Sequence, residues 1–254
     1  MARVVVVSGG GTGIGRAVAR SFVADGEQVV LLGRRAEPLR EAARELAAAA
    51  PAAPVALPLT VDLAEPTEVA RVRDELVDRF GAVDVLVNNA GGNALVGGGA
   101  PDDGLAGVRW HWESNFRTNV LTAVLLTEAL RDVLTSPGGR VLFLSSIAAY
   151  RGSGSGSYGG AKAALHPYAF DLSAALGERG ITVNVVAPGY VVDTEFFGGG
   201  LPAARHDVLV GQTHTGRASR PDDVAASVHW LAAPEAAQIT AQIVQVNGGA
   251  ERGR

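Results

Sequence analysis

Short apolar segments rich in Val, Ile and Leu alternate with longer, Ala-rich segments along the chain. The apolar segments are continuous rather than interrupted at every second position, which is typical of strands buried on both faces of a sheet. They predict seven strands, at 4–7, 28–32, 55–59, 83–87, 140–144, 182–186 and 243–246.

The segments between these strands carry apolar residues at helical spacing. They predict helices over 13–25, 37–49, 67–80, 112–134, 157–177 and 221–231. Pro66 and Pro221 lie at the start of two of them, where the first helical turn tolerates proline. The repeated strand–helix–strand order predicts an α/β protein of the Rossmann type, with a doubly wound, parallel, seven-stranded sheet and helices on both faces.

Two stretches interrupt this regularity. Segment 91–107 is rich in glycine, and segment 196–220 is long, polar and rich in glycine. Long segments of this kind within a compact domain tend to be functional, so we expect 196–220 to form a lid over a site. Because no repeat or clear linker divides the chain, we expect 1–254 to form one domain.

Composition narrows the class of protein. The 254 residues are 47% hydrophobic and 19% charged, with a formal net charge of −4 and no cysteine. Disulfides, thiolate metal sites and cysteine nucleophiles are therefore excluded, and no basic stripe indicates binding to nucleic acid. The five histidines lack metal-ligand spacing, so we expect no metal. No apolar run reaches the roughly 20 residues that span a membrane, and we expect a cytoplasmic protein.

The first predicted strand leads directly into a glycine-rich loop that opens a helix. The loop comprises Ser8, Gly9, Gly10, Gly11, Thr12, Gly13, Ile14 and Gly15. Glycine permits a tight turn and a close approach of the backbone to a pyrophosphate, and the helix N-terminus favours an anion. A flexible glycine turn is the alternative interpretation, but the position between a buried strand and a helix favours a dinucleotide phosphate site.

Tyr158 and Lys162 are four residues apart on a predicted helix, so both side chains lie on one face. A phenol with a free pKa of about 10 is a poor base at neutral pH, and a nearby ammonium lowers that pKa. The alternative interpretation is that these two residues lie on an ordinary helix surface and have no catalytic role. The position one loop after Ser146 favours general acid–base catalysis.

These motifs together resemble the short-chain dehydrogenase/reductase family, and in particular its members similar to 3-oxoacyl-acyl-carrier-protein reductases. The resemblance covers nearly the whole chain, although Ser8 stands where the family usually has threonine. Further matches follow in the family's order: Asp62, Asn88 to Gly91, Asn119, Ser145 and Ser146, Tyr158 and Lys162, Pro188 and Gly189, and Asn247 to Gly249.

The resemblance implies a role for each catalytic residue. Tyr158 exchanges a proton with the substrate oxygen, and Ser146 donates a hydrogen bond to that oxygen. Lys162 lowers the pKa of the phenol and holds the cofactor ribose, and Asn119 positions a water. Because the following loop, 147–157, is shorter than in many relatives, Ser145 stays open as the alternative catalytic serine.

The end of the second predicted strand bears on the choice of nicotinamide cofactor. Gly33 stands where NAD enzymes usually have an acid, and Arg34 and Arg35 follow. This favours NADP, with NAD as the alternative. Pairing of Arg34 with Glu37 or Glu41 is a competing interpretation. Thr12 is not basic, unlike its counterpart in many NADP-preferring relatives.

Other residues are expected along the cofactor by resemblance. Asp62 would meet the adenine edge with Leu63 packed near it, and the segment after the fourth strand would line the adenosine ribose. The segment after the sixth strand would lie near the nicotinamide. Its last residue, Thr194, would bond either the carboxamide or the phosphates of the cofactor. These two segments contribute Asn89, Ala90 and Gly91, and Pro188, Gly189, Val191 and Thr194.

The sequence predicts an oxidoreductase that transfers a hydride between NADP(H) and a small or medium-sized carbonyl or secondary alcohol substrate. The pocket is expected from 92–94, 147–150, Tyr190 and the substrate lid. It holds no basic clamp, which favours a neutral, partly apolar substrate, and an acyl-carrier thioester stays open. A non-catalytic nicotinamide-binding sensor or scaffold is the rival, and dehydration or epimerisation is a third reading.

Two further expectations concern helices. The resemblance implies that 112–134 and 157–177 form the interface of a homodimer or homotetramer, while covering the sheet is the alternative role of their apolar faces. Pro167 cannot donate to the carbonyl of Ala163 and should kink the second helix or require local rearrangement.

Overall fold

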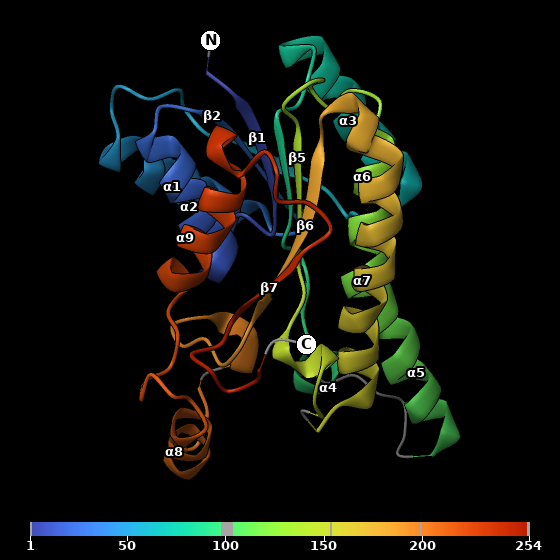
Figure 1. Cartoon of the computed structure of the whole chain (residues 1–254), viewed down its shortest axis with the longest axis vertical. Coiled ribbons are helices and arrows are strands. Elements are labelled where there is room, and N and C mark those ends of the chain that lie inside the picture. Colours follow the sequence, from blue (N-terminus) through green and yellow to red (C-terminus); the bar gives the residue numbers. More distant parts are fainter. Residues whose placement is uncertain (1, 98–103, 153, 199, 253–254) are drawn as a thin grey trace.

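Parallel strands form one sheet in the order β3-β2-β1-β4-β5-β6-β7 (Figure 1). The computed structural model describes residues 2–97, 104–152, 154–198 and 200–252. The strands are β1 (Val4–Ser8), β2 (Gln28–Gly33), β3 (Leu57–Thr60), β4 (Val85–Asn88), β5 (Arg140–Leu144), β6 (Thr182–Pro188) and β7 (Ile243–Val246). The predicted fold class is confirmed. The order reverses between β1 and β4, the kind of point at which open parallel sheets bind ligands.

Helices cover both faces of the sheet (Figure 1). One face carries α1 (Gly13–Ala24), α2 (Ala36–Ala49) and α9 (Pro221–Leu231). The other carries α3 (Pro66–Phe80), α6 (Thr122–Leu130) and α7 (Gly156–Leu176), and α5 (Leu105–Phe116) packs against α7. Shorter elements are α4 (Ala94–Gly97), α8 (Ala203–Gly211), the π-helical turn η1 (Arg117–Leu121) and the 3-10 turns η2 (Ile147–Ala149), η3 (Gly177–Arg179), η4 (Glu195–Phe197) and η5 (Pro234–Ala236).

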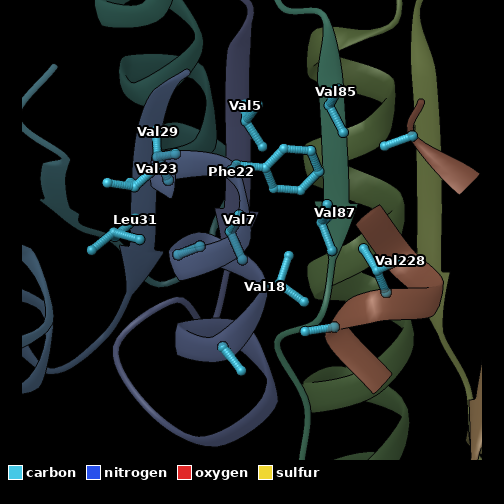
Figure 2. Close-up of a cluster of buried hydrophobic side chains, with 14 of the residues drawn as sticks. Val5, Val7, Val18, Phe22, Val23, Val29, Leu31, Val85, Val87 and Val228 are labelled. Atoms are coloured by element: carbon cyan, nitrogen blue, oxygen red, sulfur yellow. The ribbon is translucent and has the colours of Figure 1, made fainter. Parts of the chain in front are cut away.

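Two cores explain why the first four residues of β1, Val4 to Val7, are all apolar. Val5 and Val7 pack against α1 and α9, where Phe22 is fully buried (Figure 2). Val4 and Val6 belong to the core beneath α3, α6 and α7. These four residues fill both layers in turn, so the continuous apolar run is confirmed as the mark of a strand covered on both faces.

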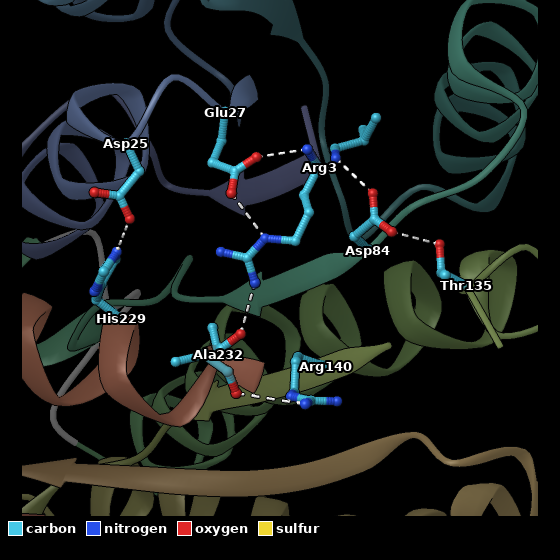
Figure 3. A network of polar contacts seen from close by, with 10 residues as sticks. Arg3, Asp25, Glu27, Asp84, Thr135, Arg140, His229 and Ala232 are labelled. Carbon is cyan, nitrogen blue, oxygen red and sulfur yellow. Dashed lines mark hydrogen bonds and ion pairs between the residues drawn. The ribbon is translucent and has the colours of Figure 1, made fainter. Parts of the chain in front are cut away.

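A polar network ties the elements at the amino ends of the strands (Figure 3). Arg3 pairs with Glu27 and donates to the carbonyl of Ala232 at 2.8 Å. The carboxylate of Asp84 accepts from the backbone at the start of β1 at 2.7 Å and from Thr135 at 2.7 Å. These contacts hold the elements together at the amino ends of the strands. The candidate site lies at the opposite edge of the sheet, where the strands end.

Several predicted boundaries are wrong. The strand predicted at 55–59 is Leu57–Thr60, since Val55 is exposed after a proline-rich turn, and the one predicted at 83–87 begins at Val85. Val83 makes only an isolated bridge with Leu134. Three predicted helices, at 37–49, 67–80 and 157–177, begin one residue earlier than expected.

The long helix predicted over 112–134 differs most from the observed structure. It begins at Leu105, within the segment expected to be a glycine-rich loop, and it changes to π geometry at Arg117–Leu121 before continuing as α6. Part of the segment 91–107 lies outside the described residues.

The other two departures concern the lid and Pro167. The lid expected over 196–220 includes the end of η4 and the helix α8, so it is partly regular, and residue 199 lies outside the described part. Pro167 lies inside α7, which continues through it to Leu176. No described helix is long and apolar enough to cross the hydrocarbon core of a bilayer.

Candidate active site

The glycine-rich loop begins where β1 ends and is held by Ser8 and Asn89. The Ser8 hydroxyl donates to the carbonyl of Val87 at 3.3 Å and accepts from the backbone N–H groups of Asn89 and Ala90, both at 2.9 Å. The Asn89 side chain donates to the carbonyls of Ser8 and Gly9 at 2.9 and 3.3 Å. These hydrogen bonds join the glycine-rich loop to the segment after β4. The hydroxyl that they require is supplied by Ser8.

Glycine is required in the loop for space and for backbone conformation. Gly9 and Gly13 have φ of 64° and 51°, and a Cβ on Gly15 would lie 2.1 Å from the carbonyl oxygen of Gly9. The N-cap residue of α1, Thr12, makes no side-chain capping bond. The first-turn N–H groups beside Ile14 therefore point to a place where an anion would satisfy them.

Thr194 provides an independent sign that a polar group fits here. Its Cγ2 lies 3.4 Å from the position of a Cβ on Gly13, so it faces the loop. Its Oγ1 is buried without a hydrogen-bond partner in the described residues. A buried hydroxyl of this kind normally has a partner, and a phosphate or carboxamide of a dinucleotide would supply one. The residues present therefore fit the expected cofactor.

The end of β2 presents two arginines at the rim of this loop. Arg34 is exposed, and no acidic side chain among the described residues pairs with it. Glu37 pairs instead with Arg40 and Arg44, so the competing interpretation of Arg34 is not what the structure has. Gly11 approaches the start of α2, and a Cβ on Gly33 would lie 3.6 Å from the side chain of Leu39.

The expected adenine side lies after β3. Asp62 accepts a hydrogen bond from the N–H of Ala64 at 3.0 Å and pairs with Arg117 at 3.0 Å. Leu63 is buried beside it. The ion pair links the Asp62 carboxylate to the π-helical turn, a connection that spacing in the sequence did not indicate.

Tyr158 and Lys162 lie buried on one stretch of α7, with Ser146 beside the phenol. The Tyr158 hydroxyl shares a side-chain hydrogen bond with Ser146. The Lys162 ammonium donates to the carbonyl of Leu144 at 2.8 Å. Lys162 is the only lysine in the chain, so its position in this cluster is conspicuous.

The structure distinguishes the two neighbouring serines. Ser145 Oγ donates to the carbonyl of Lys162 at 3.1 Å and lies 2.7 Å from His166 Nε2. Ser146 Oγ instead accepts from the N–H of Ala148 at 3.1 Å and contacts Tyr158. Ser146 is therefore the serine that the fold brings to the phenol.

Asn119 lies in the π-helical turn and faces the segment after β4. Its side chain exchanges hydrogen bonds with the backbone of Gly92, donating at 2.8 Å and accepting at 3.1 Å. A Cβ on Gly91 would lie 2.6 Å from Asn119 Oδ1 and 2.9 Å from Lys162 Nζ, so this glycine lies close to both. Single π turns in helices often occur at functional sites.

Asn115 lies beside Asn119 in the site and was not identified from the sequence. It is fully buried, accepts from the N–H of Ala94 at 3.1 Å and donates to Ser157 at 2.9 Å. It lies four residues before Asn119, so the shared helix face was the signal that could have identified it.

Burial sets the protonation of the central pair. Burial raises the pKa of Tyr158 to about 12, although the hydrogen bond with Ser146 lowers it. Burial lowers the pKa of Lys162 to about 8. The expectation that Lys162 lowers the pKa of the phenol below its ordinary value is therefore wrong for this structure, because burial is the larger effect. At neutral pH the phenol holds its proton, which suits an acid that gives a proton to an oxygen.

The segment after β6 brings aromatic side chains to the phenol. The ring of Phe196 lies 5.4 Å from that of Tyr158, and Phe197 lies 4.9 Å from Phe196 and 5.7 Å from Tyr190. The Tyr190 hydroxyl lies 3.0 Å from Nδ1 of His206 on α8. The start of the predicted lid therefore contacts the expected catalytic residue.

The first residues of this segment hold it to the sheet. Pro188 ends β6, and Gly189 donates to the carbonyl of Val246 at 3.0 Å. Val191 is buried and bridges to Ser219. Thr194 then contacts the glycine-rich loop. The segment expected near the nicotinamide and the loop expected at the pyrophosphate therefore lie side by side. The described residues contain no cluster of side chains that could hold a metal ion.

Comparisons with known proteins agree with this arrangement. Residues 9–251 match a family model described as enoyl-(acyl carrier protein) reductase. The chain is 31% identical to the 3-oxoacyl-acyl-carrier-protein reductase of Salmonella typhimurium, over 97% of this chain and 96% of the relative. It is 30% identical to the acetoacetyl-CoA reductase of Allochromatium vinosum, over 98% of both chains.

A solved short-chain dehydrogenase from Burkholderia cenocepacia, in complex with NADP, is similar in structure. Its TM-score is 0.85 at 31% identity, and the match covers 98% of this chain and 97% of that one.

Proposed function

Because the chain belongs to the short-chain dehydrogenase/reductase family of NAD(P)-dependent oxidoreductases, we propose that it transfers a hydride between NADP(H) and a carbonyl or secondary alcohol. The observation that carries the proposal is the buried phenol of Tyr158, which bonds Ser146 on the strand-end edge that also holds the glycine-rich loop.

In the reductive direction, Ser146 and Tyr158 both direct a hydroxyl toward the oxygen of the substrate. Tyr158 donates its proton as negative charge develops on that oxygen, and its raised pKa keeps the proton in place until then. The Lys162 ammonium favours the phenolate that results. Asn119 is proposed to position a water that returns a proton from solvent toward Lys162.

A nicotinamide bound at this edge would supply or accept the hydride. The loop from Ser8 to Gly15 would hold its pyrophosphate, with Thr194 as a further donor, and Asp62 would lie at the adenine. NADP is proposed over NAD because Arg34, which has no acidic partner among the described residues, would meet a 2′-phosphate, and the Burkholderia relative is in complex with NADP.

We propose a neutral, partly apolar substrate, because Phe196, Phe197 and Tyr190 give the site aromatic walls. A 3-oxoacyl thioester also fits this description, and two of the relatives are named for reductases of that class. A sensor without turnover would not need a buried phenol beside an ammonium and a serine.

Self-association is a further part of the proposal. Exposed apolar side chains follow one side of α5 and η1, and α7 adds another: Leu105, Val108, Trp112, Phe116, Leu121 and Phe170. We propose that a second copy covers this face, as a homodimer or as part of a homotetramer. A cytoplasmic location stays a prediction from the sequence.

The test is turnover of ketones and alcohols with NADPH and NADH, followed by nicotinamide absorbance, for the wild type and Tyr158→Phe. Removal of a general acid should reduce kcat by roughly 10²–10⁴-fold, with NADPH binding retained. Near-normal turnover by Tyr158→Phe would refute the assignment of the acid, and no turnover by the wild type on any substrate would favour the sensor.

A further inference from the structure

An ion pair connects two segments that are 160 residues apart in the sequence, Arg35 and Glu195. Arg35 is the N-cap residue of α2, directly after β2, and Glu195 opens η4, directly after Thr194. Spacing in the sequence gives no sign of this contact.

The pair lies beside the glycine-rich loop, since both of its segments contact that loop. A Cβ on Gly11 would lie 3.1 Å from the backbone at Pro38 and Leu39, in the first turn of α2. A Cβ on Gly13 would lie 3.4 Å from Thr194. The loop is thus flanked by the start of α2 and by Thr194, and the ion pair joins these two flanks.

The two arginines at the end of β2 differ in what they face. Arg34 has no acidic partner among the described residues, whereas Arg35 is already paired with a carboxylate. The Arg35 and Glu195 side chains are 61% and 60% exposed. An ion pair this exposed is weak and is readily exchanged for another anion.

We propose that Glu195 is a specificity-determining residue, because its carboxylate competes with the 2′-phosphate of NADP(H) for Arg35. The inference rests on the proposed function. A phosphate dianion at Arg35 would lie beside the Glu195 carboxylate, so the like charges must separate before Arg35 can serve the phosphate. A cofactor without the 2′-phosphate requires no such exchange, so Glu195 selectively weakens the binding of NADP(H).

The test compares ADP-ribose with 2′-phospho-ADP-ribose, which differ only in the 2′-phosphate and lack the nicotinamide, so binding is measured by calorimetry without turnover. Glu195→Gln should bind the phosphorylated ligand about two- to fivefold more tightly, as expected for one exposed ion pair, with the affinity for ADP-ribose unchanged. The gain should shrink at high salt, because the charges are exposed.

Two control variants separate competition from simpler effects. Glu75→Gln removes an ion-paired glutamate from α3, on the opposite face of the sheet, and should change neither affinity. In an Arg35→Gln background, Glu195→Gln should lose its effect on 2′-phospho-ADP-ribose, because no guanidinium remains to be released.

The outcomes are distinguishable. Equal changes in both affinities, or an effect that persists in Arg35→Gln, would overturn the role of Glu195 and leave the proposed function intact. A wild-type protein that binds neither ligand would overturn the proposed function as well.

Discussion

Lys162 shows how one residue opposes stability for the sake of chemistry. The residue is only 5% exposed, its ammonium pairs with no carboxylate among the described residues, and it donates a hydrogen bond to the carbonyl of Leu144. Burial lowers its pKa from 10.5 to about 8, so the folded protein holds this proton less tightly than the unfolded chain does. At neutral pH this costs roughly 3 kcal/mol of folding free energy.

Lys162→Met should therefore raise the free energy of unfolding at pH 7 by about 1–3 kcal/mol, because an apolar side chain replaces a buried charge. Turnover should be lost in the same variant. The unfolded state binds the proton between pH 8 and 10.5 while the folded state releases it, so wild-type stability rises across that window. Urea unfolding at pH 7 and pH 10 checks this, and a gain that is equal at both pH values would contradict it.

Ser145 and Ser146 are neighbours with different surroundings. Their alanine variants should therefore differ in kcat and in stability. Ser146→Ala removes the hydroxyl that contacts Tyr158, and we expect kcat to fall by roughly 10²–10³-fold, as for loss of one donor to a developing oxyanion. Ser145→Ala removes hydrogen bonds to His166 and the α7 backbone, and we expect about 1 kcal/mol of lost stability with most activity kept. Steady-state kinetics and thermal unfolding of both variants decide this, and the reverse pattern would assign catalysis to Ser145.

At the scale of elements, the glycine-rich loop and the first turn of α1 act as one unit. Gly15→Ala would place a methyl group 2.1 Å from the Gly9 carbonyl oxygen and 2.5 Å from the Asn89 amide nitrogen, so the loop must shift. We expect a loss of about 1–3 kcal/mol of stability and weaker binding of ADP-ribose. Gly211→Ala, at the end of α8 with nothing within 4 Å, is the matched control and should be neutral. Equal behaviour of the two variants in calorimetry would contradict the role of the loop.

Elements were predictable where the chain's own pattern specifies them. Continuous apolar runs located each strand to within a few residues, because a strand covered on both faces is apolar at most of its positions. The motif order identified the neighbourhood of Tyr158, Lys162 and Ser146, and spacing put two of them on one helix face.

What could not be predicted depends on contacts between distant segments. The π turn at Asn119 accompanies hydrogen bonds from its side chain to Gly92 and to the carbonyl of Asn115, which a helical period does not encode. The choice between Ser145 and Ser146 required the positions of Tyr158 and His166 on α7. The Arg35–Glu195 pair joins residues that only the closed sheet brings together.

At the scale of the whole molecule, the exposed apolar face of α5, η1 and α7 should govern self-association. Phe116 is 43% exposed and Trp112 is 50% exposed. Phe116→Arg would place a charge in the middle of a contact with a second copy, and buried unpaired charge is strongly unfavourable. We expect light scattering to give a dimer or tetramer for the wild type and a smaller species for the variant. A wild-type monomer at micromolar concentration would refute the proposed assembly.

Because the single lysine of the chain is enclosed beside the phenol, every other cationic side chain that can meet solvent is an arginine or a histidine. Amine-selective acylating reagents would therefore find no ε-amino group on the outside of the fold. Any side-chain acylation that they produce, read by mass spectrometry, would report on opening of the catalytic cluster alone, and its slowing by a bound dinucleotide would measure occupancy without a chromogenic assay.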